Sequence, residues 1–260
     1  MRHQQILDKL AARGVVQAMN QDVARWTGQQ MSYPGRSHAE VERAVIPPVL
    51  TRWRCLLDAA DAAATAKHVG WVALATLLHK YGFHDGAITA RAVASVDELN
   101  RHVLLSDVFE RRSPAIKALL QSAPTPLTRR PPHPRPVTFV RPGDVVSIQL
   151  ADRFHAAFVH ELHGANEFPV IEFYAGSFAQ LPTMAQLADR PAARADARAR
   201  FGVVGLTFLP DPARQVVALA AQHSTAPPGG DPRVGDGLWI LTDIIDLPGA
   251  TAALFDDGRD

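Results

Sequence analysis

The 260-residue sequence contains a single cysteine, Cys55, and no apolar run that approaches the roughly 20 residues of a membrane-spanning helix. One cysteine excludes an internal disulfide and suits a reducing compartment. The longest apolar run, residues 69–78, is typical of a buried helix. Asp8 and Lys9 place charges where a secretory signal would need an apolar core. We therefore expect a cytoplasmic protein with no membrane partner.

Short motifs of common catalytic sites are also missing. The sequence contains no G-x-G-x-x-G, no G-x-x-x-x-G-K-[ST] and no G-x-S-x-G. Cys55 has no base partner nearby in the sequence, so we expect it to be buried on a helix rather than nucleophilic. The sequence therefore predicts no catalytic residues, no metal and no cofactor.

Lysine is absent after Lys117, and the charge is unevenly distributed. Residues 1–123 carry 15 Lys and Arg against 11 Asp and Glu, whereas residues 137–260 carry nine Arg against 15 acids. Phosphate contacts need Lys and Arg, so the acidic part predicts no direct binding of nucleic acid. A basic protein surface is the partner that this charge favours.

The first 123 residues predict a bundle of five or six helices. Val16, Met19, Val23 and Trp26 share one helical face, which Gly28 is expected to end. Further helix signals are a Ser37–Glu40 capping box, an interruption at Pro47–Pro48, an apolar face at Trp71, Leu74 and Leu78 closed by Gly82, a Ser95–Glu98 capping box, and a start at Ser113–Pro114.

Residues 124–136 contain six prolines in thirteen positions. Proline removes a backbone donor and fixes φ, so this stretch is expected to be an extended linker between two domains. The predicted organisation is a helical domain at 1–123, a linker at 124–136 and a second domain at 137–260.

After the linker the apolar period changes to two. Residues 145–150, 154–162 and 169–176 predict three strands, and short turns between them predict an antiparallel meander. Further strands are expected at 201–208, 214–222 and 238–247, although 214–222 is Ala-rich enough to be a helix instead. A mobile loop is expected at 224–237 and an acidic tail at 256–260. The fold class is therefore α+β, with a helical bundle followed by a β-dominated domain, either an antiparallel sheet or a small open barrel.

The stretch His160-Glu161-Leu162-His163 is one residue short of the H-E-x-x-H signature of zinc proteases. That signature needs two histidines one helical turn apart, whereas this stretch lies in a predicted strand, where residues three apart point to opposite faces. We expect His160 on one face, with Glu161 and His163 on the other, and no zinc site. The same reasoning predicts that Glu161 faces Glu172 across the hairpin.

The stretch from Arg141 to Leu162 resembles the start of an immunity-protein domain from bacterial polymorphic toxin systems. Arg141-Pro142-Gly143-Asp144-Val145 matches the opening of that family, residues 154–159 occupy its second strand, and 170–176 resemble its third. The resemblance covers about residues 141–178. It implies a protein that neutralises a toxin delivered by contact-dependent or type VI secretion, and a cytoplasmic location implies a toxin such as a nuclease.

An acidic immunity protein can cover the basic surface of a nuclease, with fast, electrostatically steered association. The candidate toxin-binding residues are acids and aromatics of the second domain: Glu161, Glu172, Tyr174, Trp239, Asp243 and Asp246.

Three other functions remain open from the sequence. An adaptor or chaperone for a secreted effector would bind through the helical domain. A metal-dependent hydrolase would use His155, His160, Glu161 or His163, and a nucleic-acid-binding regulator would use Arg129, Arg130 and Arg135.

Overall fold

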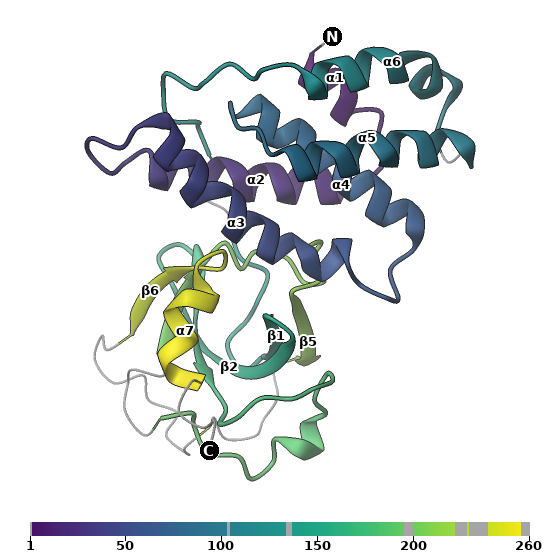
Figure 1. The fold of residues 1–260 in the computed structure, drawn as a ribbon. Coiled ribbons are helices and arrows are strands. Elements are labelled where there is room, and N and C mark those ends of the chain that lie inside the picture. The colour runs from purple at the N-terminus through teal and green to yellow at the C-terminus, as the bar shows by residue number, and fades with distance from the viewer. Residues whose placement is uncertain are drawn as a thin grey trace. The chain divides into compact units, whose positions relative to one another are not determined.

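A computed structural model of the chain describes residues 2–102, 105–133, 137–194, 200–221, 228 and 239–255. The chain divides into two compact units, Met1–Pro134 and Arg135–Asp260. The first unit is helical and the second is built on one sheet (Figure 1). The α+β fold class expected from the sequence is confirmed.

The first unit contains six helices in its described residues, which agrees with the predicted five or six. They are α1 (His3–Leu7), α2 (Arg13–Gln30), α3 (His38–Leu57), α4 (Ala64–Lys80), α5 (Gly86–Arg101) and α6 (Asp107–Gln121). The predicted face of α2 is the buried one, because Met19, Val23 and Trp26 are at most 4 % exposed. The Ser37–Glu40 capping box is also confirmed at the start of α3.

The prediction that Gly28 ends a helix is wrong. α2 continues to Gln30, and Gly28 is buried inside it. A Cβ at this position would lie 3.4 Å from the ring of His133. The segment after α6 therefore packs against α2 at this point.

The predicted interruption at Pro47 and Pro48 is also wrong, because α3 passes through both prolines. Pro48 has no N–H to donate to the carbonyl of Ala44, four residues earlier. The indole N–H of Trp26 donates to that carbonyl at 3.0 Å. A side chain of α2 thus satisfies the backbone acceptor that proline leaves open in α3.

We predict that Trp26 and Pro48 are energetically coupled. Trp26→Phe removes the indole donor and leaves a carbonyl without its partner, whereas Pro48→Ala restores a backbone donor to the same carbonyl. A double-mutant cycle measured by urea unfolding should give a coupling of about 1 kcal/mol, with Trp26→Phe costing less in the Pro48→Ala background. Strict additivity would contradict this account of α3.

Two further helix starts were predicted wrongly. Ser95 lies inside α5, which begins where the Asp85 carboxylate accepts from the N–H of Ile88 at 2.8 Å. α6 begins after Ser106, so Pro114 lies within the helix rather than at its start. In both cases an earlier side-chain cap sets the start, and the later Ser-containing signal is buried in the bundle.

Part of the Pro-rich stretch, residues 124–136, packs against the helical unit. Its residues up to Pro134 belong to the helical unit, and the backbone of Thr125 and Pro126 lies against Gly82. Gly82 follows α4 at φ +87°, as a helix-ending glycine does. A Cβ there would lie 2.8 Å from the carbonyl oxygen of Thr125 and from the Cα of Pro126. Glycine is therefore required both by the positive φ and by this close backbone contact.

The second unit contains a six-stranded open sheet. Its strands are β1 (Val145–Leu150), β2 (Arg153–His163), β3 (Phe168–Phe173), β4 (Arg200–Val204), β5 (Val216–Ala220) and β6 (Ile240–Asp243), in the order β5-β1-β2-β3-β4-β6. The predicted meander of β1, β2 and β3 is confirmed. Among the described strands, only β6 runs parallel to its neighbour, β4, and β5 and β6 form the two edges.

The final predicted strand, 238–247, is wrong in its second half. The strand stops at Asp243, whose carboxylate accepts from the N–H of Ile245 at 3.0 Å and whose carbonyl accepts from Asp246. This turn leads into α7 (Leu247–Phe255). The predicted loop 224–237, apart from Pro228, and the predicted tail 256–260 lie outside the described residues.

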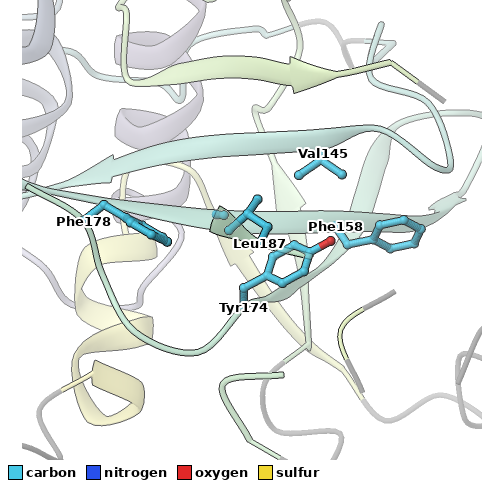
Figure 2. Close-up of a cluster of buried hydrophobic side chains, with 6 residues drawn as sticks. Val145, Phe158, Tyr174, Phe178 and Leu187 are labelled. Carbon is cyan, nitrogen blue, oxygen red and sulfur yellow. The ribbon is translucent and has the colours of Figure 1, made fainter. Parts of the chain in front are cut away.

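Apolar side chains cover both faces of the sheet. On one face a cluster joins β1 and β2 to the segment that follows β3, and it contains Val145, Ala156, Phe158, Tyr174, Phe178 and Leu187 (Figure 2). On the other face, the rings of His155, Phe201 and Phe255 surround Phe173 at centroid distances of 5.4 to 6.5 Å. Phe255 belongs to α7, so this helix completes the second core.

Candidate functional site

A β-bulge in β2 determines on which face of the sheet the side chains of residues 160–163 lie. Val159 pairs with Ile171 and Glu161 pairs with Val170, so His160 is an extra residue in β2. The extra residue changes the alternation of faces beyond it. The expectation that Glu161 and His163 lie opposite His160 is therefore wrong, since a bulge within this stretch was not considered.

His160 and Glu172 form the centre of a buried polar cluster. The Nε2 atom of His160 lies 2.7 Å from Oε2 of Glu172, and Nε of Arg200 lies 3.3 Å from Oε1. The exposed fractions of these side chains are 1 %, 5 % and 11 % for His160, Glu172 and Arg200. The cluster joins β2, β3 and β4 on the face that carries Phe158, whose ring is 5.0 Å from that of His160.

This cluster places two candidate residues inside the protein. Glu172 and Tyr174 are both 4 % exposed. Burial, and then the negative charge of Glu172, raises the pKa of Tyr174 to about 12, so its hydroxyl stays protonated. The expectation that Glu161 faces Glu172 is also wrong, because Glu172 pairs with Phe158. Glu172 and Tyr174 therefore lie inside the second unit, where they support the sheet rather than form part of its exposed surface.

Trp239 lies at the entrance to β6 and packs on the sheet. A Cβ on Gly202 would be 2.6 Å from its ring, so the indole lies directly on the backbone of β4. Trp239 also contacts His163 and Phe168, with ring centroids 5.2 and 5.6 Å away. This aromatic group fixes the ring of Trp239 while leaving part of it exposed.

β6 presents large apolar side chains to solvent. Ile240 is 47 % exposed and Leu241 is 59 % exposed, and the strand is the last in the sheet order. In the parallel pairing, the N–H of Ile244 donates to Val204 of β4, so the alternation of the strand directs the backbone N–H and C=O of Leu241 away from β4. An exposed apolar edge of this kind is a surface on which a protein partner can dock.

The two aspartates after β6 have different environments. Asp243 is 5 % exposed and its carboxylate holds the turn, so it serves the local structure. Asp246 is exposed and lies at the start of α7. Desolvation, and then the charge of Asp243, raises the pKa of Asp246.

The candidate site is therefore a β6 edge made of Trp239, Ile240, Leu241 and Asp246. Of the six predicted residues it retains two, Trp239 and Asp246. Glu161 is half-buried on β2 and lies in a different strand. Sequence reasoning missed Ile240 and Leu241 because their apolar run reads as a buried strand. The one sequence signal that this strand could lie at an edge of the sheet was that it is the last strand predicted along the chain.

The alternative metal site is not assembled. Among the described residues, no group of three or more His, Cys, Asp or Glu side chains is placed to hold a metal ion. His160 binds Glu172, His163 contacts Trp239, and His155 lies on the opposite face of the sheet against Phe255, with ring centroids 4.0 Å apart.

His155 instead gives the second unit a pH dependence. Burial, with Arg153 as a smaller cause, lowers the pKa of His155 from 6.5 to about 4. His155 therefore binds a proton below about pH 6.5 in the unfolded chain, but only below about pH 4 in the folded chain. Stability is fully present above pH 6.5 and falls between these values, by about 3 kcal/mol for this shift.

We predict that His155→Phe reduces this acid-induced loss. Thermal melts between pH 7 and pH 4 should show a smaller decrease in the variant than in the parent, and His163→Phe, at an exposed position, serves as the control. The ring NMR signal that disappears in His155→Phe should titrate near pH 4. A ring that titrates near its ordinary value, with equal acid sensitivity of parent and variant, would contradict the assignment.

Comparison with known proteins adds no relative, because no family model, curated protein or solved structure matches the chain. No helix in the described part of the chain is both long and apolar enough to cross a membrane.

Proposed function

We propose that this chain is an immunity protein that acts in the cytoplasm, where it binds and neutralises a cognate secreted antibacterial toxin, a nuclease being the toxin class that the charge favours. The observation that carries the proposal is the β6 edge, which exposes Ile240 and Leu241 beside a half-buried Trp239. The β1–β2–β3 meander that bears the family resemblance lies in the same sheet.

The make-up of the β6 edge suits a protein partner. Aromatic and aliphatic anchors supply most of the binding energy in protein interfaces, and charged residues at the rim mainly raise the rate of association. Trp239 and Leu241 fit the first role and Asp246 fits the second. An interface of ordinary size covers about 800 Å² on each partner, so neighbouring surface of the second unit must contribute as well.

The acidic balance of residues 137–260, nine Arg against 15 acids, favours a basic partner. A nuclease presents such a surface because it binds phosphates. Association is then expected to weaken as salt is added, since salt screens attraction between exposed charges.

Co-expression is the first test. The chain should be produced together with the toxic domain encoded beside it, with survival scored and complex formation measured by size-exclusion chromatography. Rescue with a stoichiometric complex is the expected result. A stable complex with a partner that is not toxic would identify an adaptor instead, and toxicity without rescue or complex would overturn the proposal.

We predict that Leu241→Lys weakens toxin binding by about 30-fold or more, which corresponds to the loss of an anchor of roughly 2 kcal/mol. Phe139→Lys is the matched control, because Phe139 is 66 % exposed in the same unit but lies outside the β6 edge. Calorimetric titration measures both. Equal affinities, or a larger loss in Phe139→Lys, would move the interface away from β6.

Asp246→Lys should act mainly on the association rate. We expect slower association and a weaker salt dependence, with a small change in dissociation, when binding is followed by surface plasmon resonance. Asp243 is unsuitable for this comparison, because replacing its buried carboxylate removes the turn after β6.

A further inference from the structure

Three side chains far apart in the sequence form a hydrogen-bonded row in the helical unit. The Oγ atom of Ser122, which follows α6, lies 3.2 Å from Nε2 of His79 on α4. The Nδ1 atom of the same imidazole lies 2.8 Å from Nε2 of His3 on α1. A hydroxyl, an imidazole bonded through Nε2 and a third group on Nδ1 are the arrangement that activates a serine nucleophile, and both distances fall within its usual range.

The exposure of these residues suits the same chemistry. Ser122 is exposed, so a reagent can reach its hydroxyl, whereas His79 is 6 % exposed and is held between two partners. Burial, followed by the charges of His79 and Lys80, lowers the pKa of His3. The lowered pKa favours the neutral form of His3, which can accept a hydrogen bond from Nδ1–H of His79 through its Nε2 atom.

A simpler role is available for His79, and the chain contains an internal control for it. Nε2 of His79 also lies 3.1 Å from the carbonyl of Ser122, so it can cap the end of α6. Ser32 lies just after α2 and Ser122 just after α6, and the two serines share two features: each is exposed, and each hydroxyl donates to the carbonyl three residues earlier at 2.7 Å. Of these two serines, Ser122 has a histidine beside its hydroxyl, whereas the described contacts of the Ser32 hydroxyl include none.

We propose that Ser122, His79 and His3 form a nucleophilic site that accepts an acyl group from an activated ester. Ser122 is the nucleophile, His79 is its base, and His3 is a positioning residue that holds His79 in the required tautomer. The site lies in the helical unit and does not depend on the function proposed for the second unit.

The step balances within the site and the ester. The Ser122 hydroxyl first turns its proton from the Leu119 carbonyl to Nε2 of His79. Oγ of Ser122 then bonds to the carbonyl carbon as this proton passes to Nε2. The bond between that carbon and the leaving-group oxygen breaks, and the leaving oxygen takes the proton from His79. The products are an ester on Ser122, a free alcohol or phenol, and a neutral His79, so neither an oxidant nor another co-reactant is needed.

The test uses the full-length protein and p-nitrophenyl acetate, with acetylation of Ser122 and Ser32 followed separately by peptide mass spectrometry. We expect acetyl to accumulate on Ser122 much faster than on Ser32. His79→Gln keeps a donor for the Ser122 carbonyl but removes the base, and it should slow acetylation of Ser122 by about 10²-fold. Equal acetylation of the two serines, or an unchanged rate in His79→Gln, would overturn the proposal.

The role of His3 is tested by a pair of variants. His3→Phe should slow acetylation of Ser122, and His3→Gln, which keeps an acceptor for Nδ1–H of His79, should restore most of the rate. Ile6 and Leu7 are buried and unchanged in both variants, so α1 is expected to stay in place, which circular dichroism can check. Equal losses in both variants would show that His3 acts only through packing.

A thiol version avoids any dependence on the fold of the histidine variants. Ser122→Cys and Ser32→Cys change one exposed atom each, and iodoacetamide reports thiol reactivity at each site, with Cys55 mapped on its own peptide. An imidazole beside the thiol promotes the thiolate, so Ser122→Cys should react about tenfold faster than Ser32→Cys. Equal rates would mean that His79 does not activate the position.

Discussion

The second unit depends on the pairing of one buried carboxylate. Glu172 is at the middle of the sheet, and a charge removed from water is tolerated only with close partners. His160 supplies one partner from β2, and Arg200 supplies another from β4. These two contacts tie three neighbouring strands together on one face of the sheet. A shift of one residue in either pairing would separate the charges and also turn the apolar side chains over.

The bulge at His160 and the candidate edge both follow from this constraint. The extra residue in β2 brings His160 to Glu172 while Glu161 and the residues after it continue the pairing with β3. Arg200 is the first residue of β4, and β4 pairs in parallel with β6. The buried cluster thus holds β4, the strand against which β6 and Trp239 pack.

The helical unit uses the same principle twice. Asp22 is buried and binds Arg25, Arg52 and the indole of Trp53 at 2.9, 2.7 and 3.2 Å, which joins α2 to α3. Trp26 provides a donor for the Ala44 carbonyl that Pro48 leaves without one. Both contacts run between the same two helices. Polar groups buried among apolar side chains therefore specify how these helices pack. A buried polar group without a hydrogen-bond partner would lower the stability of the fold more than an imperfect apolar contact would.

The sequence by itself determined the two-part α+β organisation, because the change from helical period to strand period at the Pro-rich stretch is a local property. It also predicted β1 at residues 145–150 and the Ser37–Glu40 cap, where neighbouring residues suffice. Only the tertiary structure decided that Glu172 and Asp243 are buried, that Ile240 and Leu241 are exposed, and that α3 passes through two prolines. The bulge in β2 and the hydrogen-bonded row from Ser122 to His3 were likewise visible only in the tertiary structure. Each depends on contacts between segments distant in the chain, and a pattern of nearby residues carries no information about such partners.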